Sequence, residues 1–218
     1  MSDKTIPKKA FISPTTGLII LMVLHGVGII GIVNNLSSSL FISLTPLHLL
    51  VSAVILFSFH RDWRSYFIFF MVLTFILGFF VEVLGIQTGT VFGQYSYSPV
   101  LGPSLFDTPI IIGVNWLMLI YATGIICNRI SNNILIRALC AMSLMILLDI
   151  FIEPVAIKLD FWQWESATIP LQNYFAWGIV SFLLLYFFYF LPFAKENAIA
   201  TKFYLVQISF FIALNLLL

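Results

Sequence analysis

Long apolar runs alternate with short polar stretches along almost the whole chain. Seven such runs occur, at residues 16–36, 45–60, 64–85, 109–127, 133–157, 171–193 and 201–218. Six approach or exceed the ~20 residues that a helix needs to cross a bilayer, whereas the second is shorter and is expected to be shielded by its neighbours. The pattern predicts an all-α, polytopic transmembrane bundle of about seven helices. It forms a single domain over residues 16–218, after a polar, cytoplasmic tail at residues 1–15.

Composition strengthens this prediction. Of the 218 residues, 61% are hydrophobic and 9% are charged, against about 25% charged residues in soluble domains. The first run could instead be a secretory signal peptide, but it exceeds the usual ~7–15 apolar residues and His25 interrupts it. A net charge of +1 gives no sign of nucleic-acid binding. The two cysteines, Cys127 and Cys140, form neither a disulfide framework nor a metal-ligand spacing.

Lysine and arginine residues predict the orientation in the membrane. With seven crossings, all but one of the ten lie on one side: Lys4, Lys8, Lys9, Arg61, Arg64, Arg129, Arg137, Lys195 and Lys202. Only Lys158 lies on the other side. Because positive residues concentrate in cytoplasmic loops, the N-terminus is expected in the cytoplasm and the C-terminus outside. The predicted location is the cell membrane.

Polar residues from distant runs are predicted to lie at one depth, near the outer boundary. From the rise of about 1.5 Å per residue, Glu82 lies roughly 27 Å above the cytoplasmic end of its helix, and Asp149 and Glu153 roughly 24 and 30 Å above theirs. Asp149 and Glu153 are four apart, hence on one helix face. His48, Asn115 and Asn173 are expected within two turns of the outer ends of their helices.

The stretch from residue 82 to 116 is rich in glycine, tyrosine and proline, and is predicted to form the lid and one wall of a membrane site. Carboxylates within a bilayer are costly and usually face a cavity. Two other interpretations compete: the carboxylates could simply be hydrated at the interface, and Tyr95, Tyr97, Trp162 and Trp164 could form an aromatic belt at headgroup level.

Motifs for several kinds of chemistry are absent. The chain has no H-E-x-x-H, P-loop, G-x-S-x-G or G-x-G-x-x-G motif, and its three histidines lack a di-iron spacing. No metal and no cofactor is therefore predicted. Acid–base chemistry on an apolar substrate remains.

Two long motifs carry a family resemblance. E-V-L-G-I-Q-T-G-T-V-F-G-Q-Y-S-Y, followed by G-V-N-W, and D-I-F-I-E-P-V-A-I-K-L-D-F-W-Q-W resemble the membrane carotenoid biosynthesis family, from the second helix to the sixth. Its characterised members are cofactor-free carotenoid 1,2-hydratases that act on acyclic end groups. One departure is that Asp107 and Thr108 precede Pro109, where a glycine and a small apolar residue are expected.

The resemblance implies addition of water across the terminal C1=C2 bond of a carotene, such as γ-carotene or lycopene, to give a tertiary alcohol. Protonating an alkene requires an acid that stays protonated near neutral pH, and burial favours this state of a carboxyl group. Asp149 or Glu153 is predicted to donate the proton, and Glu82 to orient water or act as the base. Residues predicted to bind substrate are His48, Phe92, Tyr95, Tyr97, Asn115, Trp116, Trp164 and Asn173. The expected partners are a carotenoid in the bilayer, water and other carotenoid enzymes.

Two other functions fit part of the pattern. An end-group cyclase or isomerase would use the same protonation but keep water from the cation, so its product would gain no mass. A small transporter or proton-coupled channel would use the carboxylates as a relay. A relay needs polar residues across the full membrane thickness, and the cytoplasmic halves of the runs are nearly bare, which disfavours transport.

Overall fold

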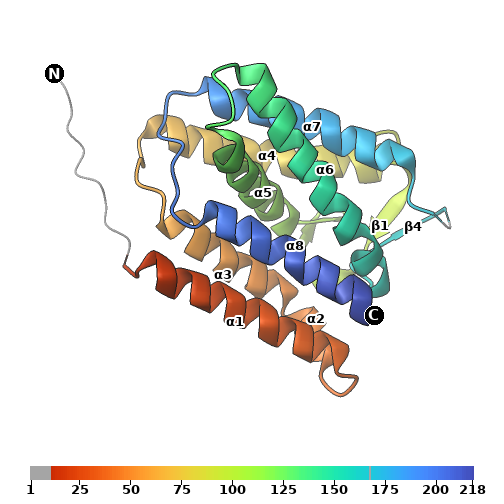
Figure 1. Ribbon diagram of the computed structural model, residues 1–218. Helices are drawn as coiled ribbons and strands as arrows, with labels where there is room; N and C mark the ends of the chain where they lie inside the picture. Colours follow the sequence, from red (N-terminus) through yellow and green to blue (C-terminus); the bar gives the residue numbers. More distant parts are fainter. Residues whose placement is uncertain (1–10, 167) are drawn as a thin grey trace.

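The computed structural model describes residues 11–166 and 168–218, and this part of the chain is mostly helical (Figure 1). The helices are α1 (Pro14–Val33), α2 (Ser38–Ser43), α3 (Thr45–Ser58), α4 (Ser65–Thr88), η1 (Pro99–Leu101), α5 (Ile111–Cys127), α6 (Ile134–Lys158), α7 (Leu171–Phe190) and α8 (Ala200–Leu217). The short strands are β1 (Tyr95–Tyr97), β2 (Ser104–Leu105), β3 (Thr108–Pro109) and β4 (Trp162–Trp164). Residues 1–10 of the expected tail lie outside the described residues. Its last two residues belong to α1.

Within the described residues, five helices are long and apolar enough to cross a membrane: α1, α4, α6, α7 and α8. Large apolar side chains are exposed on their outer faces, including Ile30 on α1 and Phe175 on α7, each more than 70% exposed. Water would penalise such surfaces, whereas lipid matches them. The chain is therefore a membrane protein. The remaining two predicted segments correspond to the shorter helices α3 and α5, and the number of seven crossings stays a prediction.

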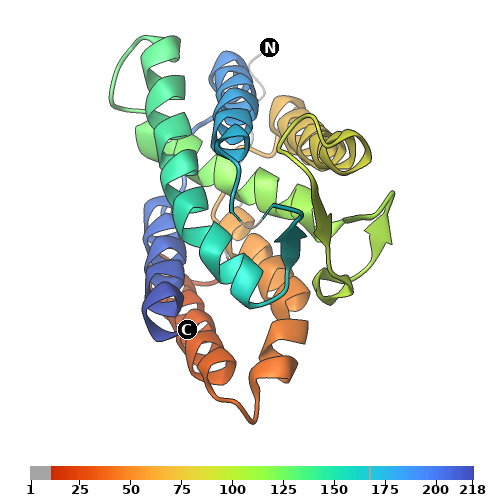
Figure 2. The ribbon, with the colours of Figure 1, turned by 90° about the vertical axis from the view of Figure 1, so that its right-hand side faces the viewer.

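Helix α5 lies in the middle of the molecule (Figure 2). It contacts α3, α4, α6, α7 and α8, and most of its side chains are buried, among them Trp116, Met118 and Tyr121 with no exposed surface. A helix enclosed by other helices need not match the thickness of the lipid, which accounts for its length of 17 residues. It also places Trp116 against both α4 and α7.

The second predicted segment corresponds to α3, which begins at Thr45, and the short helix α2 directly precedes it. Backbone hydrogen bonds continue from α2 into α3, from the Leu44 amide to the Leu40 carbonyl (3.1 Å) and from the His48 amide to the Leu44 carbonyl (2.9 Å). Residues 38–58 thus form one bent helical segment of about 30 Å. The apolar pattern did not predict α2, because serines stand at both of its ends. His48 lies in the first turn of α3, as the sequence predicted, and near the middle of the combined segment α2–α3.

Two small antiparallel sheets, which the apolar pattern did not predict, lie in the connections between helices. β1 pairs with β4, and β2 pairs with β3. Phe106 and Asp107 connect β2 to β3 with φ angles of 53° and 61°, as in the two-residue type I′ turn. Asp107 therefore occupies a left-handed position that aspartate tolerates better than most residues. The β1–β4 pair lies at the end of the bundle where α8 terminates (Figure 1).

Asp62 joins the two connections at the opposite end of the bundle. Its carboxylate accepts hydrogen bonds from the Arg64 guanidinium (2.5 and 2.7 Å) and from the Ala194 backbone amide (2.7 Å). The hydrogen bonds from Arg64 are the main reason that the pKa of Asp62 is lowered to about 2. The carboxylate therefore stabilises the fold above its ordinary pKa of 3.8, and this contribution is lost as the pH falls toward 2.

Replacing Asp62 with alanine is expected to lower the free energy of unfolding by about 1–3 kcal/mol, because it leaves the Ala194 amide without its acceptor. Thermal unfolding in detergent between pH 2 and 7 measures both effects. The wild-type protein should lose its advantage over Asp62→Ala between about pH 4 and pH 2. Equal stability of the two proteins at pH 7 would contradict this account.

Candidate active site

Glu82 is a buried carboxyl group that accepts hydrogen bonds from three side chains. It lies near the C-terminal end of α4 and is 3% exposed. Its Oε2 accepts the hydroxyls of Tyr95 (2.5 Å) and Tyr97 (2.9 Å), and its Oε1 accepts the Trp116 indole N–H (2.8 Å). A carboxylate offers about four acceptor positions, so a single position on Oε1 is left unused.

Glu153 on α6 has a matching set of donors. Its Oε2 accepts the indole N–H groups of Trp162 (3.1 Å) and Trp164 (2.9 Å), and its Oε1 accepts the side-chain amide of Asn173 (3.0 Å). Glu153 is 2% exposed. By the same count, one position on its Oε1 is also unused.

The β1–β4 pair explains why two tyrosines donate to Glu82 and two tryptophans donate to Glu153. In the antiparallel register, Tyr95 is opposite Trp164 and Tyr97 is opposite Trp162. Side chains two apart on a strand share one face, so all four aromatic rings project to the same side. The strand β1 thereby gives both of its inward hydroxyls to Glu82, and β4 gives both of its indoles to Glu153.

Both tyrosines act as stable donors. Burial, and then the nearby Glu82 carboxylate, raise the pKa of Tyr95 well above its ordinary value. Burial and Glu82 raise the pKa of Tyr97 in the same way. Both phenols therefore favour the protonated form, in which each can donate a hydrogen bond that stabilises a negative charge on Glu82.

Asp149 lies one helical turn before Glu153 and is completely buried. The amide nitrogen of Asn173 donates to Asp149 Oδ2 (3.0 Å) and to Glu153 Oε1 (3.0 Å), so it bridges the two carboxyl groups. Asp149 Oδ1 has no hydrogen-bond partner among the described residues. A buried carboxylate oxygen without a donor is costly, so this oxygen is suited to carry a proton.

A small cavity separates Glu82 from Glu153, with about 30 Å³ available to the centre of a water molecule. That volume is enough for one or two waters. The side chains of Trp116 and Trp177 stack beside it, with ring centroids 4.4 Å apart. The cavity is lined by Glu82, Phe92, Tyr95, Tyr97, Ile112, Asn115, Trp116, Ile152, Glu153, Trp162, Trp164, Asn173 and Trp177.

Most residues predicted for the site lie together in the structure. Glu82, Glu153 and seven of the eight predicted substrate-binding residues line this cavity, and Asp149 adjoins it through Asn173. The exception is His48, which lines a different pocket, between α1, α3 and α8. His48 lies on the face of α3 that is directed toward α1 and α8, beside His25.

Four lining residues were missing from the predicted site: Ile112, Ile152, Trp162 and Trp177. Trp162 had been interpreted as a possible member of an interfacial belt. The alternation W-Q-W is the signal that could have identified it, because a strand would direct both tryptophans to one face. Trp177 occurs in a helix rich in aromatic residues, and the sequence carries no signal that separates it from the others.

Comparison with known proteins agrees with the resemblance of the two motifs. The sequence profile of the carotenoid biosynthesis protein family matches residues 42–218. A bisanhydrobacterioruberin hydratase from Haloarcula japonica is 28% identical over 120 residues, which cover 48% of this chain and 39% of the relative. The chain thus matches well under half the length of that curated relative. No solved structure matches. Since the family profile spans most of the chain, the protein belongs to the carotenoid biosynthesis protein family.

Proposed function

We propose that this protein is a carotenoid hydratase of the cell membrane, which adds water across the terminal C1=C2 double bond of an acyclic carotenoid end group. The observation that carries the proposal is that Glu82 and Glu153, both buried, face one cavity of the size of a water molecule. Hydration of an alkene needs an acid, a base and a held water, and these are the groups that the cavity offers. The hydratase from Haloarcula japonica supports the reaction class.

The proposed acid is the pair formed by Asp149 and Glu153. The two carboxyl groups share the single amide nitrogen of Asn173, and neither has a cationic partner among the described residues. Two adjacent buried carboxyl groups do not both ionise readily, because like charges repel. One proton therefore remains on the pair. Asp149 Oδ1, which has no donor, is the more favourable place for this proton at rest, and Glu153, which lines the cavity, is the member from which the substrate would receive it.

The proposed base is Glu82. Three O–H and N–H donors stabilise its negative charge, and its unused acceptor position is on Oε1. A water in the cavity would donate to that position. The water would then be held and oriented by the group that removes its proton.

The proposed hydration proceeds by proton transfer, water attack and proton return. Glu153 transfers a proton to C2 of the alkene, and the π electrons form the new C–H bond, which leaves a tertiary cation at C1. The water oxygen attacks C1 while Glu82 takes one of the water protons. Transfer of that proton from Glu82 back to Glu153 restores the enzyme, and the net change is the addition of one water.

Aromatic walls suit the cation in this scheme. The faces of tryptophan and tyrosine rings attract positive charge, and the cavity is lined by four tryptophans and two tyrosines. The end group of a carotenoid is larger than the cavity, so its binding requires that lining side chains move apart. The proton donor and the water would then meet the substrate in a site closed to bulk solvent.

Expression in a bacterium that accumulates lycopene or γ-carotene tests the function. Mass analysis of the pigments should show a new product heavier than its parent by one water per reacted end. A cyclised or isomerised product of unchanged mass would replace the hydratase proposal with the end-group cyclase or isomerase. Unchanged pigments, with the protein present in the membrane, would contradict both.

A further inference from the structure

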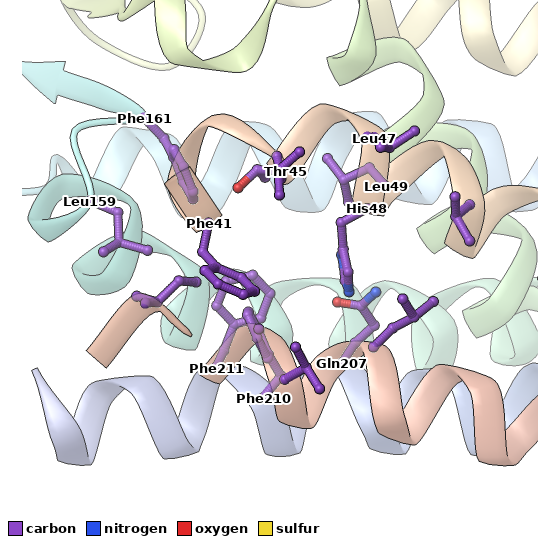
Figure 3. Close-up of a pocket in the computed structure, with 16 residues that line it drawn as sticks. Phe41, Thr45, Leu47, His48, Leu49, Leu159, Phe161, Gln207, Phe210 and Phe211 are labelled. Carbon is purple, nitrogen blue, oxygen red and sulfur yellow. The ribbon is translucent and has the colours of Figure 1, made fainter. Parts of the chain in front are cut away.

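A second pocket lies on the other side of the molecule from α4, between α1, the bent segment α2–α3 and α8 (Figure 3). It has about 230 Å³ available to the centre of a water molecule. Its walls are leucine, isoleucine, valine and phenylalanine side chains, including Phe41, Phe210 and Phe211. Phe161 lines one end of it, one residue before Trp162 of the carboxylate cavity. A pocket with such walls fits a hydrocarbon chain.

Polar groups interrupt these walls at two places, at Thr45 on the side of Phe161 and at a cluster around His48 (Figure 3). His48 points from α3 toward Gln207 of α8, well away from Phe161 (Figure 3). His25 of α1 packs edge-on against His48, with ring centroids 4.4 Å apart. His25 and Gln207 are 3% and 5% exposed. Buried polar side chains in a membrane bundle are costly and are retained where they meet a partner.

His25 and His48 each have a ring nitrogen without a hydrogen-bond partner among the described residues. The Nδ1 atom of His25 lies 2.8 Å from the Leu21 carbonyl oxygen, which can only accept, so Nδ1 carries the hydrogen. In the neutral ring, Nε2 of His25 is then an acceptor, and it has no partner among the described residues. Nε2 of His48 is likewise buried without a partner. Gln207 adds an amide donor and a carbonyl acceptor at the same place.

We propose that this pocket binds an isoprenoid chain that bears a hydroxyl group, with the hydroxyl held by His48 and Gln207 and with His25 orienting His48. A hydroxyl both donates and accepts, as do a neutral imidazole and an amide, whereas a hydrocarbon can do neither. The identification of the ligand as a carotenoid hydrated at one end rests on the proposed function. The pocket would then distinguish a hydrated chain from its unhydrated precursor.

Binding of two matched ligands tests the proposal: an acyclic carotene and its 1-hydroxy derivative, each titrated onto the purified full-length protein in detergent. The pigment retained per protein gives the affinity without any turnover. The hydroxylated ligand should bind the wild-type protein more tightly. His48→Leu and Gln207→Leu should each weaken it by about tenfold and leave carotene binding unchanged, because each removes a hydrogen bond to the hydroxyl.

Two further variants separate polarity from packing. His48→Gln keeps a donor and an acceptor and should retain the preference for the hydroxylated ligand, whereas Leu49→Met changes the wall conservatively and should affect neither ligand. Equal binding of both ligands to the wild-type protein, or equal loss of both in His48→Leu and Gln207→Leu, would overturn the proposal, because His48 and Gln207 would then not recognise the hydroxyl. A protein that binds as expected but forms no hydrated product would contradict the proposed function and leave this pocket's ligand class intact.

Discussion

Glu153→Gln is expected to reduce formation of the hydrated carotenoid by about 10²–10⁴-fold, the usual contribution of a general acid. The amide is close in size to the carboxyl group, and its oxygen can still accept from Trp162 and Trp164, so these two side chains should keep their places. Its nitrogen cannot accept the hydrogen bond from Asn173, which still has Asp149 as an acceptor. It has no acidic proton to give to an alkene. The measurement is the yield of hydrated pigment per amount of membrane-inserted protein, in the same carotene-producing bacterium.

The control for this substitution is Glu165→Gln. Glu165 is an exposed carboxyl group just after Trp164, outside the residues that line the cavity, and its loss should leave the yield unchanged. Asp149→Asn and Glu82→Gln complete the series. The proposed roles require large losses in all three cluster variants. Full activity in all three would end the acid–base mechanism, and full activity in Glu153→Gln with loss in Asp149→Asn would move the donor to Asp149.

Much of the site was predictable because membrane insertion makes each polar residue informative. Lipid gives no reason to keep Glu82, Asp149 or Glu153 in an apolar helix, so their depth along the chain already indicated a common layer. Counting residues along straight helices is reliable, since the rise per residue is fixed. The structure agrees, with Asn173 joining two of the three groups.

The pairing of donors with carboxyl groups could not be predicted in the same way. It depends on the register of β1 against β4, and these strands are more than 60 residues apart and only three residues long. Neither strand has an apolar alternation long enough to predict a sheet. Tyr95, Tyr97 and Trp164 were predicted for the site. Only the structure shows that the two tyrosines donate to Glu82 and that Trp164, together with Trp162, donates to Glu153.

His48 is the exception among the predicted site residues, and the reason is the helix face on which it lies. Its helix α3 begins at Thr45, where the apolar run predicted it. His48 is directed toward α1 and α8, beside His25, and not toward the carboxyl groups. A helix that is apolar on most of its surface does not indicate from its sequence which face meets which neighbour.

Gly78→Ala is expected to damage both stability and activity, because Gly78 of α4 packs directly against Trp116 of α5. A Cβ atom at Gly78 would lie 2.5 Å from Cβ and 2.8 Å from Cγ of Trp116. Gly78 is four residues before Glu82, on the same face of α4, so any separation of the helices also pulls Glu82 from the Trp116 indole. Overpacking of this kind costs about 1–3 kcal/mol, and the yield of hydrated product should fall at least tenfold, which is about 1.4 kcal/mol in transition-state stabilisation.

Gly26→Ala is the matched control, since a Cβ atom there would meet nothing within 4 Å. Thermal unfolding in detergent and product yield should remain near those of the wild-type protein. If Gly78→Ala behaves like Gly26→Ala, the close contact of α4 with α5 does not hold the site together.

A double variant tests whether Gly78→Ala lowers the product yield by displacing the Trp116 indole. Trp116→Phe removes the indole N–H that Glu82 Oε1 accepts but keeps a ring against Trp177. If Gly78→Ala acts by displacing this indole, adding it to Trp116→Phe should reduce the product yield little further, because the hydrogen bond is already absent. Additive losses would instead show that the inserted methyl group disturbs the cavity beyond Trp116. The close approach of two helices at one glycine would then control the shape of the whole site, with Glu82 as one of several groups displaced.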